Sequence, residues 1–472
     1  MVDLNVVALD SHGQAVTDLT RDDFRVTDSG KPQDIAFFHH RDEQLAPPSA
    51  LRPNEFSNRT GANIPRATLI LFDLMNERFG TRGATANQLI HALESLETAK
   101  FVYLYLLTLD GRLYPVHGLP ESQEDTSSTE GVPWTSQIKP MLDQALRSVP
   151  LIRPVDVDVA VREQLTYSAL DAIAGELSRV PGRKSVVWLT DGVPIELGPQ
   201  RSDTGDYVDF TPLLRQMSEA FDRSKVAIYP VRQVMMGSPE SMGGAETSGL
   251  GSIDTLAQFA EMTGGRPDAG KDIGIALRQA ITDMRTSYQI GYYPPARNWD
   301  DKFHKLRIAC TRKGVRIQAK TGYYAWQGPP GSRSGQAIDA AIPTAFDAAE
   351  IGLRATLSHD PKGGRAVHLD AHINAQDVVL VHAGDGYKGE LRLAVVGYAS
   401  GFDPIRGPVI PLDFNLSADD HDKALRQGIG FVQDIALAEQ ITAVRLIVFD
   451  RGSNAIGSVT IPVRQGDPGK PD

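Results

Sequence analysis

Two short apolar runs, each ending on an aspartate, are the clearest pattern along the chain. The first is ATLILFD at residues 67–73, and the second is SVVWLTD at residues 185–191. A continuous apolar run of this length is typical of a strand that is buried on both faces. In open parallel sheets, ligands bind beyond the carboxyl ends of the strands. The pattern therefore predicts that Asp73 and Asp191 lie at one edge of a shared sheet.

Strand and helix periods alternate through the middle of the chain. Further strands are expected at residues 101–109 and 226–231, and an antiparallel edge strand at residues 112–118 after a turn at Asp110 and Gly111. Helices are expected at residues 86–97, 136–148, 162–179, 211–222, 252–262 and 272–285. This alternation predicts an α/β fold class, with a largely parallel sheet covered by helices on both faces.

The segments on either side of this region are rich in β patterns separated by turns. We expect a small β module at residues 1–45, a linker at 46–66, an α/β domain with β additions at 67–326, a linker at 327–340 and a β-sandwich at 341–466. The last assignment depends on turn-separated alternating runs, which favour an immunoglobulin-like architecture.

Composition and charge exclude several classes of function. The chain has 48 Lys and Arg against 59 Asp and Glu, a formal net charge of −11, which argues against nucleic acids and anionic membranes as partners. The sequence has no apolar stretch long enough for a membrane helix. It has one cysteine, Cys310, so no disulfide can form within the chain.

Several separate motifs, in order, resemble one known family. The strand ending in Asp73, FVYLYLLTLDGRLYPV, LDAIAGELSRVPGRKSVVWLTDG, SYQIGYYP and TGYYA are similar to the von Willebrand factor A-related proteins of the acidobacterial type, over about the first 325 residues. The resemblance implies a Rossmann-like domain that binds a partner protein through its upper rim. It also implies export, with the signal peptide absent from this chain, although a cytoplasmic location stays open.

The family's rim carries a metal-ion-dependent adhesion site, and this sequence matches it only in part. Asp73 and Asp191 correspond to its two aspartates, and Thr166 to its loop threonine, with Ser168 or Gln164 as alternatives in another register. Met75 and Glu77 replace its two serines. A thioether is a poor ligand for Mg²⁺ or Mn²⁺, whereas the Glu77 carboxylate restores an oxygen, and Asn76 could add another.

These residues support two interpretations of the rim. In the first, Asp73, Glu77, Thr166 and Asp191 hold Mg²⁺ or Mn²⁺ in a degenerate adhesion site. In the second, Asp73 caps or turns the chain while Met75 packs in the core. A separate zinc site at His368, Asp370 and His372, which share one strand face, is weighed against an ordinary solvated face.

Motifs typical of catalysis are absent from the sequence, which has no phosphate-binding loop, dinucleotide fingerprint, H-E-x-x-H or G-x-S-x-G. The first hypothesis is therefore a non-enzymatic protein-binding or adhesion scaffold with an unidentified protein partner. One alternative is a metal-dependent hydrolase that uses the same carboxylates with His91 or His117 as base. Another is a structural component of an envelope assembly, which makes its contacts through the C-terminal sandwich.

Overall fold

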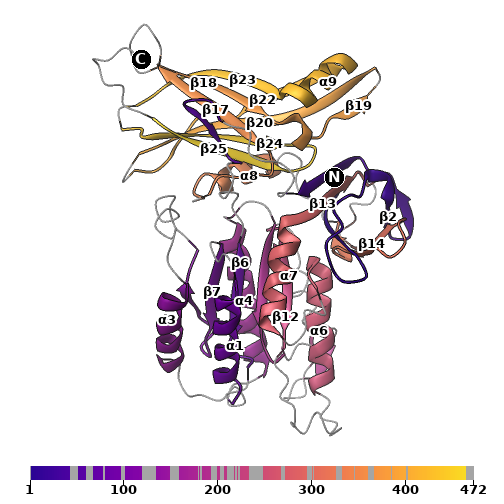
Figure 1. Ribbon diagram of the computed structural model, residues 1–472, viewed down its shortest axis with the longest axis vertical. Coiled ribbons are helices and arrows are strands. Elements are labelled where there is room, and N and C mark those ends of the chain that lie inside the picture. Colours follow the sequence, from indigo (N-terminus) through magenta and orange to yellow (C-terminus); the bar gives the residue numbers. More distant parts are fainter. Residues whose placement is uncertain are drawn as a thin grey trace.

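The fold is described from a computed structural model and is rich in β-strands (Figure 1). The structure describes residues 2–42, 51–59, 67–77, 80–96, 101–119, 134–148, 159–178, 180, 183–192, 199–201, 207–209, 217, 220–221, 224–232, 248–266, 272–294, 300, 302–325, 332–344, 346–359, 366–383, 385–399, 402–438 and 440–463. Within this part of the chain, 43% of residues lie in strands and 27% in helices.

The predicted fold class, a Rossmann-like α/β von Willebrand factor A domain with β modules at its ends, is wrong. The described strands form six sheets, and five of them contain antiparallel pairs alone. Parallel pairing is confined to one five-stranded sheet. The alternation of apolar patterns correctly predicts local strands and helices. It does not report the antiparallel pairs that form between segments far apart in the sequence.

The five-stranded sheet contains strands from both apolar runs, the one that ends on Asp73 and the one that ends on Asp191. Its strand order is β12-β9-β6-β7-β8, and β8 alone runs antiparallel to its neighbour. In that order the strands are Val226–Val231, Lys184–Leu189, Thr68–Asp73, Val102–Leu107 and Leu113–His117. Every residue of the first four strands is buried, because helices pack against both faces.

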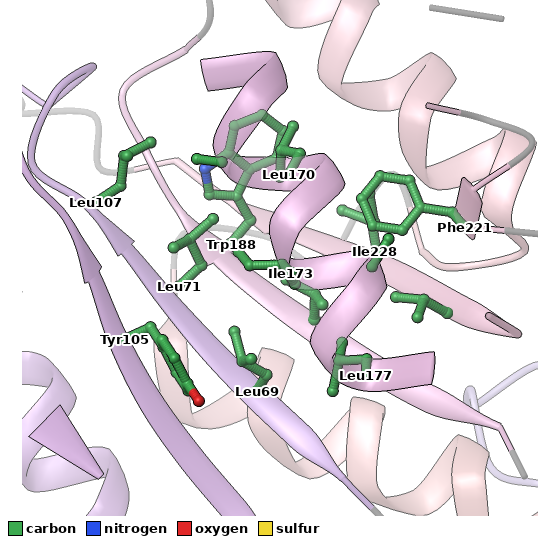
Figure 2. Packing of buried hydrophobic residues seen from close by; sticks show 14 of the residues in the cluster. Leu69, Leu71, Tyr105, Leu107, Leu170, Ile173, Leu177, Trp188, Phe221 and Ile228 are labelled. Atoms are coloured by element: carbon green, nitrogen blue, oxygen red, sulfur yellow. The ribbon is translucent and has the colours of Figure 1, made fainter. Parts of the chain in front are cut away.

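Each face of this sheet has its own apolar core. Helices α4 (Val159–Ser178) and α6 (Ser248–Thr263) cover one face, where Leu170 and Phe259 pack against Trp188 and neighbouring strand residues. Figure 2 shows this cluster, with the Trp188 ring against α4. The other face is covered by α1 (Arg82–Glu94), α3 (Trp134–Ser148) and α7 (Ile273–Arg285).

The N-terminal strands share two sheets with strands that follow α7. The first sheet has the order β15-β1-β13-β4 and the second β16-β14-β2-β3. The bounds are β1 Val2–Leu9, β2 Phe24–Asp28, β3 Lys31–Gln33, β4 Phe37–Asp42, β13 Thr286–Tyr292, β14 Phe303–Cys310, β15 Arg316–Gln318 and β16 Gly322–Tyr324. The sequence predicts separate units for the two ranges, whereas in the structure they share one core.

Two further sheets face each other in the C-terminal part. One has the order β23-β18-β17-β5, and the other is β19-β20-β24-β25 with β21 and β22 paired to β20. The bounds are β5 Glu55–Ser57, β17 Leu353–His359, β18 Ala366–Ile373, β19 Val381–Ala383, β20 Gly386–Tyr398, β21 Ile405–Arg406, β22 Ile410–Ser417, β23 Ile429–Ala436, β24 Ala443–Asp450 and β25 Ile456–Pro462. Helix α9 spans Ala418–Gln427.

A short separate sheet pairs β10 (Pro199–Arg201) with β11 (Tyr207–Asp209).

Both segments that the sequence analysis assigned to linkers contain regular structure. Residues 55–57, within the expected linker 46–66, form β5 at the edge of a C-terminal sheet. Residues 332–341, in and just beyond the expected linker 327–340, form α8, whose Ile338 packs against β20 and β24. Glycine, proline and serine residues suggested flexible connections here, but tertiary contacts order these segments.

Candidate functional site

The carboxyl ends of β6 and β9 place the predicted site residues at one edge of the five-stranded sheet. These two strands are parallel neighbours, with Phe72 opposite Leu189. Asp73 is the last residue of β6, and Asp191 lies two positions beyond the end of β9. The loop from Asp73 to Glu77 then leads toward α1. We call the described residues around these strand ends the carboxyl edge.

Asp73 is fully buried, and donors from Asn76 and Trp188 hold its carboxylate. The backbone N–H of Asn76 donates to Oδ1 at 3.0 Å, and the Asn76 side-chain amide donates to Oδ2 at 2.8 Å. The Trp188 indole N–H donates to Oδ2 at 3.1 Å. Burial raises the pKa of Asp73 above its usual value, while the bonds from Asn76 and Trp188 oppose that rise. Asp73 therefore turns the chain after β6 and fixes the loop that follows.

Asn76 belongs to a closed ring of hydrogen bonds with two residues of α4. Arg162 Nη2 donates to Asn76 Oδ1 at 3.1 Å, and Asn76 Nδ2 donates to Thr166 Oγ1 at 2.9 Å. The Thr166 hydroxyl donates to the backbone carbonyl of Arg162 at 2.7 Å. Because a guanidinium can only donate, it fixes which end of the Asn76 amide carries the oxygen.

Glu77 is a second buried carboxyl group at the carboxyl edge. The Thr85 hydroxyl donates to its Oε1, while its Oε2 is buried without a hydrogen-bond partner among the described residues. Burial raises the pKa of Glu77 to about 8, and the Asp191 and Asp73 carboxylates add to this rise. Glu77 is therefore mostly protonated at neutral pH.

Arg82, in the first turn of α1, brings a buried guanidinium to the same edge. Its Nη2 donates to the backbone carbonyl of Leu74 at 2.6 Å, which ties the helix to the loop after β6. Burial lowers the pKa of Arg82, whereas Glu77 and Asp73 favour its charged form. The guanidinium thus contributes positive charge beside the two buried carboxyl groups.

The structure brings the four predicted metal ligands to one region, but in different environments. Asp73, Glu77 and Thr166 are buried, and Asp191 is half-buried with its Oδ2 at 3.5 Å from the Thr81 hydroxyl. In the described ranges, no group of three or more His, Cys, Asp or Glu side chains is placed to hold a metal ion.

The two alternatives to Thr166 lie on the solvent side of α4. Ser168 is exposed and donates to the backbone carbonyl of Gln164, which is also exposed, at 2.9 Å. Met75 is fully buried in the core around Trp188. Asp73 therefore turns the chain and Met75 packs in the core, while metal binding by the four residues stays a prediction.

Three participants in this network carried no functional signal in the sequence. Trp188 looked like one more apolar strand residue, and Arg82 and Arg162 like ordinary charged helix positions. The spacing of Asp73 and Asn76 was the one available cue, because aspartate commonly accepts from backbone N–H groups a few residues ahead. Only the packing of β9, α4 and α1 around β6 and the loop after it brings Trp188, Arg162 and Arg82 to this edge.

The remaining candidate residues lie away from the carboxyl edge. His368 is exposed on β18, and its Nδ1 lies 2.7 Å from Asp434 Oδ1 on the adjacent β23. Asp370 and His372 are on the same strand, with the nearest ion-pair atoms 4.0 Å apart. His91 pairs with Glu94 on exposed positions of α1, and the His117 ring stacks on Tyr103.

Comparisons with known proteins give no family for this chain. No family model matches it, and no curated protein matches it. Among solved structures, the chain is similar to the hypothetical protein PH1083 from Pyrococcus horikoshii OT3, with 9% identity over 24% of this chain and 87% of that chain, and a TM-score of 0.17. A likeness at this level carries no argument about fold or function. In the described part of the chain, no helix has the length and apolar character needed to cross a membrane.

Proposed function

We propose that this chain is a non-enzymatic protein-binding scaffold that contacts its partner through the carboxyl edge of the five-stranded sheet. The observation that carries the proposal is the use of polar groups there to fix loop conformation. Asp73 accepts from Asn76 and Trp188, and Arg82 ties α1 to Leu74. A binding surface gains affinity when its loops are ordered before the partner arrives.

The position of the C-terminal sheets supports the same assignment. Lys184 is the first residue of β9 and Lys225 directly precedes β12, so both mark the amino edge of the sheet. Lys225 Nζ lies 2.5 Å from Glu350 Oε1, just before β17. The C-terminal sheets therefore contact the amino edge, and the carboxyl edge is at the opposite ends of the strands. Figure 1 shows these sheets at one end of the five-stranded sheet.

A comparison of two exposed positions on α1 tests the proposal. Ala84 lies in the first turn, beside the carboxyl edge, whereas His91 lies in the last turn. Partners are captured on immobilised protein, cross-linked and identified by mass spectrometry, using wild type, Ala84→Arg and His91→Arg. We expect a specific protein to be captured by wild type and His91→Arg but lost with Ala84→Arg. Equal capture by all three, with all three folded, would refute binding at this edge.

A further inference from the structure

The position of the Asn76 amide between two buried oxygens has a consequence for metal binding. Its Nδ2 lies 2.8 Å from Asp73 Oδ2 and 2.9 Å from Thr166 Oγ1. Asp73, Asn76 and Thr166 are all buried, at 0%, 5% and 0% exposed respectively. Carboxylate and hydroxyl oxygens are the donors that hold hard divalent cations. Here both oxygens instead accept from one amide nitrogen.

The structure assigns to the Asn76 side-chain amide the place that a divalent cation would occupy between Asp73 and Thr166. The resemblance described above implies a cation held by this aspartate and this threonine, and the residues present do not fit one. Asp73 Oδ2 already accepts from Asn76 and from Trp188. The carboxyl edge is therefore held by internal donors.

The orientation of the amide follows from its neighbours. Arg162 donates to Asn76 Oδ1, so the amide nitrogen must point toward Asp73 and Thr166. The Thr166 hydroxyl donates its hydrogen to the Arg162 carbonyl, which leaves its lone pairs to accept from Asn76. Each group in the ring thus has a defined role as donor or acceptor, and reversing the amide would place two donors against each other.

Positive charge reaches the same region from two helices. Arg162 on α4 contacts Asn76 directly; burial lowers the pKa of Arg162, whereas the Asp73 carboxylate favours its charged form. Arg82 on α1 approaches from the other side of the loop and contacts the Leu74 carbonyl. The two guanidinium groups supply charge opposite the buried carboxyl groups, which is the electrostatic contribution a divalent cation would otherwise make.

The substitution Asn76→Asp tests this assignment because it keeps the shape and replaces the amide nitrogen by oxygen. Two carboxylates and the Thr166 hydroxyl would then converge, and the repulsion between the carboxylates is relieved by a shared proton or by a bound cation. Melting temperatures are measured in chelator and in millimolar Mg²⁺, Mn²⁺ or Ca²⁺. We expect no shift for wild type. Asn76→Asp should melt lower in chelator and recover by several degrees with at least one of the cations.

A matched control is Asn58→Asp, at another buried asparagine far from this edge. Asn58 is 4% exposed, and its amide donates to the carbonyls of Ala348 and Ile351 at 2.6 and 2.8 Å. The same substitution there should lower the melting temperature without rescue by any cation. Rescue of equal size in both variants would overturn the inference, because it would not depend on Asp73 and Thr166.

Binding of Mn²⁺ provides a second test that does not depend on melting temperatures alone. Binding of Mn²⁺ is measured by the loss of the free-ion electron paramagnetic resonance signal, for wild type and for Asp73→Asn. We expect equal binding by both. A site present in wild type and lost in Asp73→Asn, together with a cation-dependent rise in wild-type melting temperature, would overturn the inference.

The inference has one consequence for partner binding, which rests on the proposed function. Capture of the partner at the carboxyl edge should persist when a chelator is present. The melting and Mn²⁺ experiments use the purified chain alone. Failure to capture a partner would therefore count against the proposed function and would not affect the inference about Asn76. Binding of Mn²⁺ at Asp73 would count against the inference about Asn76 and would not affect the result of the capture experiment.

Discussion

The Trp188 indole N–H donates to the Asp73 carboxylate at 3.1 Å, across two neighbouring parallel strands of the five-stranded sheet. Trp188 is fully buried, and its ring belongs to the core between the sheet and α4 (Figure 2). One side chain thus joins the apolar core to the polar carboxyl edge. It also gives a buried carboxyl group a donor that solvent cannot supply.

Replacing Trp188 by phenylalanine should destabilise the protein through Asp73. The substitution keeps an aromatic ring but removes the donor from a buried carboxyl group, which costs about 1–3 kcal/mol in addition to the loss of ring volume. Urea denaturation of Trp188→Phe, Asp73→Ala and the double variant forms a double-mutant cycle, because alanine removes the acceptor. A coupling free energy near zero would show that this hydrogen bond contributes nothing.

Glu77 should make stability fall as pH rises. Its pKa is raised from 4.5 in the unfolded chain to about 8 in the folded chain, so the folded state binds more protons between these values. Its stabilising contribution is present below pH 4.5 and is lost as pH rises through 8. At about 1.4 kcal/mol per pKa unit, the loss amounts to a few kcal/mol.

The variant Glu77→Gln isolates this contribution because glutamine stays neutral at every pH. We expect its free energy of unfolding, relative to wild type, to increase between pH 5 and pH 9. Denaturation at a series of pH values measures the difference directly. A constant difference between the two proteins over this range would show that Glu77 has an ordinary pKa in the folded state.

Two glycines provide opposite predictions for the same substitution. A Cβ atom at Gly265 would lie 1.8 Å from the backbone oxygen of Ile228, so Gly265→Ala must displace β12 or α6. At Gly175, exposed within α4, the added Cβ would meet no atom within 4 Å. We expect Gly265→Ala to lower the melting temperature strongly, whereas Gly175→Ala should stabilise the helix by roughly 0.5–1 kcal/mol. Calorimetry measures both melting temperatures. Equal changes in the two variants would contradict the close contact between Gly265 and Ile228.

Lys225 and Glu350 link the five-stranded sheet to the C-terminal sheets. The Glu350 side chain is 4% exposed, and its second oxygen accepts from the backbone N–H of Ile456 at 3.0 Å. Lys225→Met leaves this carboxylate without its nearest cation, which costs less than the about 3–5 kcal/mol of a fully buried pair because the Lys225 side chain is 21% exposed. Adding Glu350→Gln to Lys225→Met should recover part of that loss in urea denaturation, since Asp3, 3.8 Å from Lys225 Nζ, also loses its cation. No recovery in the double variant would contradict a role for charge at this junction.

Local apolar patterning predicted the individual strands of the five-stranded sheet well. The strands at 102–107 and 226–231 lie within the expected ranges, and the strand at 184–189 begins one residue before the apolar run 185–191. Runs of consecutive apolar residues favour a strand that is buried on both faces. The same patterning predicted the wrong fold class. The pairing of β1 with β13, and of β5 with β17, joins segments from distant parts of the chain, and no local pattern reports such contacts.

For the candidate site, the sequence by itself determined that Asp73, Glu77 and Asp191 follow strand ends, since each position is set by the residues beside it. Tertiary structure decided their environments. Trp188 comes from a neighbouring strand, Arg162 and Thr166 from α4, and each contributes a hydrogen bond that depends on packing across the sheet. A carboxyl group binds a cation or accepts from an amide according to the groups packed around it, and those groups come together only when the chain folds.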